Sequence, residues 1–103
     1  MKSSKTVEKI NKKILAVTKQ LEHDLIKDFP NFTSLTHTVK FDHFPASLFF
    51  SCVFNISSDN ANQDFQKIKQ QEVTYQKKLH KFLFKQGILL KAPSQNLQFC
   101  LKS

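Results

Sequence analysis

The chain contains 103 residues and carries a formal net charge of +8, because it has 16 lysines, no arginine and eight acidic residues. Hydrophobic residues make up 40% of it, which is enough for a core, so the length predicts one folded domain spanning 1–103 and excludes a wholly disordered chain. The single glycine excludes the glycine-rich loops of dinucleotide and P-loop sites. Two cysteines without CxxC spacing exclude a disulfide framework and a zinc site.

The first predicted element is an amphipathic helix that runs from Ser4 to Asp28. Proline disfavours helical geometry in the residue before it, so Pro30 ends the helix. Apolar residues recur along it at steps of three and four, which places them on one face. They are Val7, Ile10, Ile14, Val17, Leu21 and Leu25.

Residues 35–56 predict a β-hairpin, because apolar and polar residues alternate on both sides of a loop at His43–Ala46. This loop pairs strand 35–41 with strand 47–56 so that all the partners lie on one face, which we expect to face the core. The reverse face, which includes Phe49 and Val53, is expected to be exposed to solvent. The predicted pairs are Phe41 with Leu48, Val39 with Phe50, His37 with Cys52, and Leu35 with Phe54.

A second helix is predicted from the capping loop 57–60 to about Gln86, with Gly87 as the left-handed residue that follows it. At about 1.5 Å per residue this helix would be some 40 Å long, which leaves open whether it is continuous, bent or broken. Leu97–Leu101 predicts a final strand.

The predicted order is therefore α-β-β-α-β, which indicates an α+β domain. Two helices packed on one face of a three-stranded sheet would bury both apolar stripes. The third strand reaches the sheet by a crossover, so it should run parallel to the second strand and antiparallel to the first.

Catalytic signals in the sequence are weak. A thiol beside an imidazole can become a nucleophile, but Cys52 and His37 both fall on the predicted core face, which favours an inert cysteine packed against a tucked-in histidine. Asp42 and His43 adjoin each other in the loop without a third group. The four histidines have no ligand spacing. We therefore expect no enzyme, no metal, no cofactor and no small-molecule substrate.

Charge is distributed unevenly along the chain. Residues 1–20 contain six lysines and one acid, residues 21–64 two lysines and six acids, and residues 65–103 eight lysines and one acid. Both helices present lysines opposite their apolar stripes, and side by side they would form one basic surface. The candidate nucleic-acid-binding residues are Lys9, Lys12, Lys67, Lys77, Lys78, Lys81 and Lys85.

Such a surface favours contact with the phosphate backbone of RNA or DNA. The lack of arginine argues against base-specific reading, since arginine makes the commonest contact to guanine. The alternative is a protein-interaction module or homodimer that uses apolar residues outside the stripes (Leu15, Ile26, Val73 and Phe84) or the Phe49/Val53 sheet face. No signal peptide or run of roughly 18–20 apolar residues is present, so we expect a cytoplasmic protein away from membranes.

Two resemblances accompany this interpretation. The order of elements and the segment 91–99 (KAPSQNLQF) resemble the KH-like domain of ribosome-binding factor A, which implies a KH-like fold and RNA binding. The segments 32–37 (FTSLTH), 41–48 (FDHFPASL) and 52–54 (CVF) are similar to small bacterial proteins labelled Fis-type transcriptional regulators. That label implies a C-terminal helix-turn-helix, whereas the residues after Gly87 predict a strand.

Overall fold

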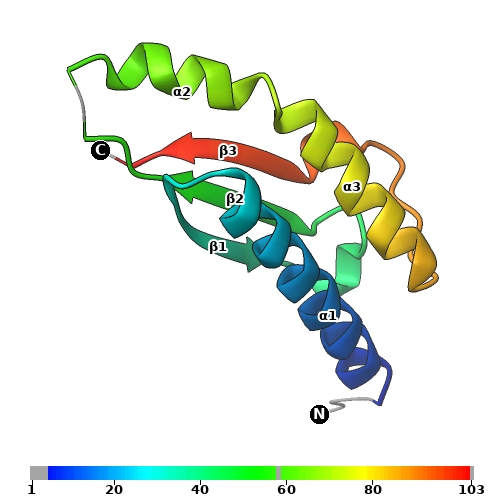
Figure 1. Cartoon of the computed structure of the whole chain (residues 1–103). Coiled ribbons are helices and arrows are strands. Elements are labelled where there is room, and N and C mark those ends of the chain that lie inside the picture. Colours follow the sequence, from blue (N-terminus) through cyan, green and yellow to red (C-terminus); the bar gives the residue numbers. More distant parts are fainter. Residues whose placement is uncertain (1–4, 58, 103) are drawn as a thin grey trace.

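Alternating apolar residues form a mixed three-stranded sheet, which two helices cover on one face (Figure 1). The computed structural model describes residues 5–57 and 59–102. The sheet has the order β1-β2-β3, with β1 antiparallel to β2 and β2 parallel to β3. The elements are α1 (Lys5–Asp28), β1 (Phe32–Thr38), η1 (Phe41–His43), β2 (Phe49–Phe54), α2 (Ala61–Lys69), α3 (Glu72–Lys85), η2 (Pro93–Gln95) and β3 (Leu97–Leu101).

The predicted α+β order is confirmed, with the second helix divided into α2 and α3. The predicted direction of the third strand is also confirmed, because β3 runs parallel to β2. Gly87 follows α3 with a φ of 82°, the left-handed geometry that glycine adopts without a steric penalty. In Figure 1, α1 and α3 run in opposite directions over the same face of the sheet, while α2 extends past β3.

The core lies between this pair of helices and the covered face of the sheet. The α1 stripe supplies four buried residues from Ile14 to Leu25, as predicted. Phe54 is fully buried at the centre of an aromatic group, with ring centroids 4.9 Å from Phe99 and 5.3 Å from Phe29. Phe65 places α2 against the same ring, at 6.4 Å. Aromatic packing therefore joins the end of β2 to α2.

The predicted hairpin register is wrong by two residues. Leu35 lies opposite Cys52, and His37 lies opposite Phe50 rather than Cys52. The loop is longer than predicted because the Ser47 hydroxyl accepts a hydrogen bond from the Lys40 main-chain N–H and donates one to the Lys40 carbonyl, so residues 39–48 leave the ladder. A shift of two preserves which side chains face the core, so the predicted buried face of β2 is confirmed.

The break between α2 and α3 lies beside the outer edge of β3. Lys69 and Glu72 flank the break and form an ion pair at 3.0 Å. The Phe99 N–H donates to the Glu72 carboxylate at 2.8 Å, and the Lys69 ammonium donates to the Phe99 carbonyl at 3.2 Å. These two side chains satisfy main-chain groups that an edge strand otherwise leaves open.

Asn96 is a buried polar residue that holds the hairpin loop against the start of β3. It is 3% exposed, and its side-chain amide donates to the Leu48 carbonyl at 2.6 Å and to the Pro45 carbonyl at 3.4 Å. Its own carbonyl accepts from the Phe50 N–H at 2.8 Å. Asn96 therefore ties the long loop at residues 39–48 to the start of β3.

Replacing Asn96 by alanine is expected to lower the free energy of unfolding by about 2 kcal/mol, because the buried Leu48 carbonyl loses its side-chain donor. Urea denaturation of the variant and the unaltered chain measures the difference. Asn55→Ala is the matched control, since Asn55 is exposed and should change stability by less than about 0.5 kcal/mol. Equal losses at the two positions would contradict the assigned role of Asn96.

Candidate nucleic-acid interface

Polar contacts join α1 to α3 along one seam. The Tyr75 hydroxyl donates to the Asp28 carboxylate, and the Lys78 ammonium lies 3.4 Å from Asp24, 3.9 Å from Asp28 and 4.6 Å from the centre of the Tyr75 ring. Burial, together with the hydrogen bond to Asp28, raises the pKa of the Tyr75 hydroxyl above its usual value. Lys78, one of the candidate residues, is therefore engaged within the fold.

The other lysines of α1 and α3 that were predicted to bind nucleic acid are exposed. No ion pair reaches any of them among the residues that the structure describes. They are Lys9 and Lys12 on α1, and Lys77, Lys81 and Lys85 on α3. The last three are spaced by four residues and so follow one line along the helix surface.

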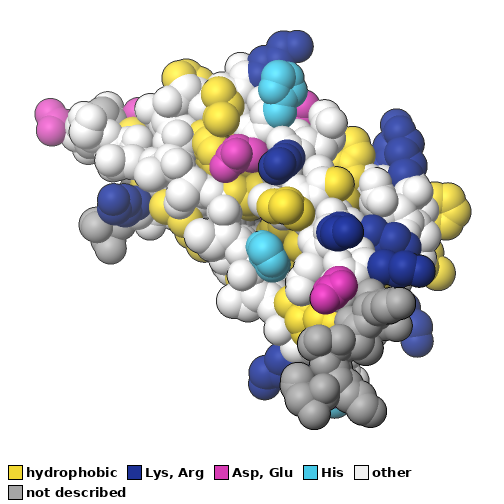
Figure 2. Space-filling model, turned by 90° about the horizontal axis from the view of Figure 1, so that it is seen from below, with side chains coloured by type: hydrophobic (Ala, Val, Ile, Leu, Met, Phe, Trp, Pro, Cys, Tyr) yellow, Lys and Arg dark blue, Asp and Glu magenta, His cyan; other side chains and the backbone are white. Residues whose placement is uncertain are grey.

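These lysines lie on the solvent side of α1 and α3, which run in opposite directions. The first half of α1 thus lies beside the last half of α3, and the Lys13 ammonium group lies 3.9 Å from where a Cβ atom on Gly87 would sit. Figure 2 shows lysine side chains gathered towards the right-hand end of the molecule, where α3 finishes in Figure 1. We call Lys9, Lys12, Lys13, Lys77, Lys81 and Lys85 the basic surface.

The basic surface differs from the predicted set of lysines at two further positions, Lys67 and Lys13. Lys67 is exposed but lies on α2, beyond the break, so it does not continue the line of α3. Lys13 was not among the predicted residues, and in the folded chain it is half-buried. Only its position beside Gly87 in the folded chain brings it to the basic surface.

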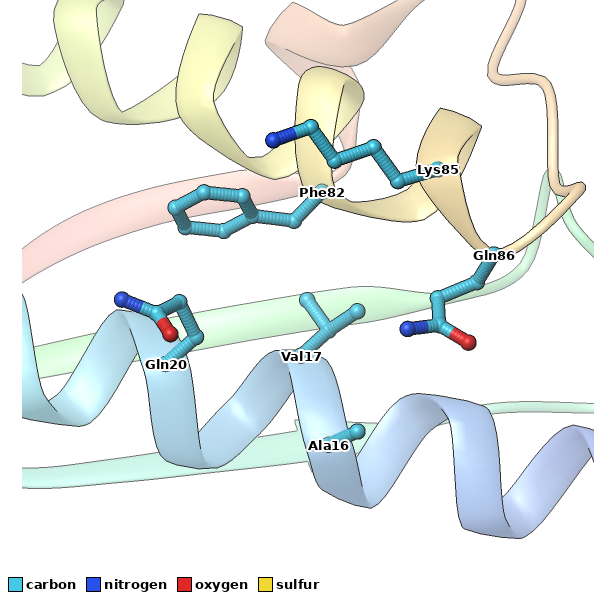
Figure 3. A pocket seen from close by; sticks show the side chains of 6 residues that line it. All are labelled: Ala16, Val17, Gln20, Phe82, Lys85 and Gln86. Atoms are coloured by element: carbon cyan, nitrogen blue, oxygen red, sulfur yellow. The ribbon is translucent and has the colours of Figure 1, made fainter.

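The basic surface contains a groove of about 420 Å³ between the two helices. Ala16, Val17 and Gln20 line it from α1, and Phe82, Lys85 and Gln86 line it from α3 and the residue that follows. In Figure 3 the Phe82 ring projects into the space between the helices, and the side chains of Gln20 and Val17 point towards α3. The groove therefore combines an aromatic ring, two amides and an ammonium group.

The predicted pairing of His37 with Cys52 does not form. His37 is exposed, with its ring centroid 5.5 Å from that of Phe50, whereas Cys52 is fully buried. Burial raises the pKa of the Cys52 thiol to about 12, so the thiol stays protonated near neutral pH. Cys52 is thus a buried thiol, as predicted, but without a histidine packed against it.

The pKa of Cys52 predicts a loss of stability in alkali. Between the ordinary thiol value of 9.0 and about 12, the unfolded chain releases this proton while the folded chain keeps it, so stability falls as the pH rises. We expect this group to lower the free energy of unfolding by about 1–2 kcal/mol at pH 10. Urea denaturation at pH 8 and pH 10 measures the loss, and Cys52→Ala should show a shallower one. An equal pH dependence in both proteins would contradict this assignment.

The other catalytic candidate of the sequence analysis, the Asp42–His43 pair, lies on the surface. The Asp42 and His43 side chains approach to 3.6 Å but are both more than 70% exposed. Within 5–57 and 59–102, no three His, Cys, Asp or Glu side chains come together in an arrangement that could hold a metal ion. No helix in the described part of the chain is both long and apolar enough to cross a membrane.

The apolar residues outside the stripes form two groups rather than one. At about 100° per residue, Leu15 and Ile26 lie roughly 160–180° around α1 from Asp24, which faces α3. Val73 and Phe84 lie about 120–140° around α3 from Lys78, which faces α1. All four are more than half exposed, and each pair points away from the partner helix.

Comparison with protein-family models, with curated protein sequences and with solved structures finds no match to this chain. Functional inference therefore depends on the charge and shape of its own surface.

Proposed function

We propose that this chain is a small, non-catalytic nucleic-acid-binding protein that holds the phosphate backbone of RNA or DNA on its basic surface. The observation that carries this proposal is that several lysines without an ion pair gather on two adjacent helices. Lys69 and Lys78 are matched by nearby acids, whereas the lysines of the basic surface have no acidic partner among the described residues. Unmatched positive charge on adjacent helices attracts a polyanion.

Lysine is suited to this task because its ammonium group acts as a point charge on a flexible stem. It contacts phosphates in many geometries and carries little base specificity. Phosphate contacts position a nucleic acid, whereas base contacts specify its sequence. We therefore expect binding with weak sequence preference. Both cysteines have free thiols, which accords with a proposed cytoplasmic location.

A salt titration tests the proposal. Fluorescence anisotropy of a labelled 12-nucleotide strand and a labelled 12-base-pair duplex should report binding at 50 mM salt that weakens steeply towards 200 mM. Each phosphate contact contributes a slope of about −0.7 to −0.9 in a plot of log K against log salt concentration. We expect a slope of about −3 or steeper, which corresponds to four or more contacts. The absence of binding to both probes at 50 mM salt would overturn the proposal.

A further inference from the structure

The groove between α1 and α3 has chemistry that phosphate binding alone does not use. Phe82 is half-buried and packs against the core on one side, and its ring enters the groove in Figure 3. Gln20 and Gln86 lie on opposite sides of the groove, and neither side-chain amide has a hydrogen-bond partner among the described residues. An amide offers both a donor and an acceptor.

These groups match the parts of one nucleotide. An aromatic ring provides a stacking surface for the flat face of a base, and this interaction tolerates any sequence. Carboxamides can pair with the donors and acceptors on a base edge. Lys85 lines the same groove, and in Figure 3 its side chain extends along α3 on the side of Phe82, where it can meet the attached phosphate. A volume of about 420 Å³ falls within the range of small-ligand sites, about 300–1,000 Å³.

We propose that the groove receives one base of a single-stranded nucleic acid, stacked on Phe82, while the surrounding lysines hold the phosphates on either side. This inference depends on the proposed function and narrows its ligand to single strands. A duplex must first break pairing and stacking to place a base in the groove, which costs several kcal/mol. An unpaired strand already exposes its bases.

Three 12-nucleotide probes test this site with the unaltered protein at 100 mM salt. They are oligo(dT), oligo(U) and a strand of the same length whose sugars carry no bases. We expect oligo(dT) to bind about tenfold more tightly than the abasic strand built on deoxyribose, because the two carry the same phosphates and sugars and only the base is removed. Each of the two base-bearing strands should also bind more tightly than a 12-base-pair duplex. The comparison of oligo(dT) with oligo(U) reports the combined effect of the sugar and of the thymine methyl group.

A protein variant gives a second readout. Phe82→Leu keeps an apolar side chain against the core but removes the ring, so single-strand affinity should fall about tenfold while duplex affinity and the salt slope stay unchanged. Phe84→Leu is the matched control, because Phe84 is 63% exposed and does not line the groove. Circular dichroism verifies folding, and the abasic comparison remains decisive if Phe82→Leu unfolds.

The outcomes separate the two proposals. Equal binding of base-bearing and abasic strands, with salt-dependent affinity retained, would overturn the base site and leave the proposed function intact. Absence of binding to every probe at 50 mM salt would overturn both. Loss of affinity on removing the bases, together with a selective effect of Phe82→Leu, would support the site.

Discussion

Replacing Lys81 and Lys85 together by glutamine is expected to lower the affinity for a 12-nucleotide single strand on the order of 50-fold at 0.1 M salt. Each contact to phosphate releases nearly one counterion, so at this salt concentration it contributes a factor of roughly 5–8. Both side chains are exposed, and glutamine preserves about half of the apolar stem. The slope of log K against log salt concentration should become shallower by about 1.4–1.8.

The matched control replaces Lys67 and Lys102 by glutamine, which removes the same charge from exposed sites on α2 and after β3. This variant should lose less than about threefold in affinity, because it changes only the long-range field, which salt screens over about 10 Å at 0.1 M. Fluorescence anisotropy at four salt concentrations measures both variants. Equal losses would mean that net charge, rather than the basic surface, determines binding.

The second large effect is expected at Phe54, where alanine should lower the free energy of unfolding by about 3–5 kcal/mol. The ring is fully buried, and its centroid lies within 6.4 Å of the rings of Phe29, Phe32, Phe65 and Phe99. Removing it leaves a cavity that the sheet and helices cannot fill completely. A domain of this size has a total stability of about 5–15 kcal/mol, so this single change removes a large part of it.

Urea denaturation measures the effect, and Phe84→Ala is the control. Phe84 is 63% exposed, so the same chemical change should alter the free energy of unfolding by less than about 1 kcal/mol. If Phe54→Ala does not fold, Phe54→Leu keeps most of the volume and should show a smaller loss in the same direction. A loss at Phe54 no larger than that at Phe84 would contradict the core described here.

Much of the fold follows from local pattern. The stripe of α1 predicts its buried face because apolar residues recur with the period of the helix. β3 has the predicted bounds, Leu97–Leu101, and Gly87 has the predicted left-handed geometry. In each case the signal lies within a few neighbouring residues.

The hairpin register, which sequence reasoning missed, and the break in the second helix, which it left open, both depend on contacts with other parts of the chain. The register of the hairpin is fixed by hydrogen bonds of Ser47 to Lys40 and of Asn96 to the loop. Neither contact produces a periodic pattern in the sequence. The break between α2 and α3 contains no glycine or proline. It lies where Lys69 and Glu72 reach the edge of β3, some 30 residues further along the chain.

The sequence predicts a lysine-rich surface on the two helices, but it does not predict all of the residues that form it. A helical wheel places Lys78 among the outward lysines because it considers one helix at a time, whereas Asp24 and Asp28 of α1 pair with Lys78 only after the helices pack. Lys13 joins the basic surface for the same reason. The groove and its aromatic ring arise from two helices together, so neither helix alone indicates them.

The most direct test of the account is a map of amide chemical shifts in the ¹⁵N-labelled chain as a 12-nucleotide single strand is added. We expect the largest changes on residues 9–20 of α1 and on residues 77–87 of α3 and its C-terminal turn. The uncovered face of the sheet, around Thr36, Ser51 and Gln98, should change little. Changes concentrated on that sheet face, or no changes at low salt, would contradict it.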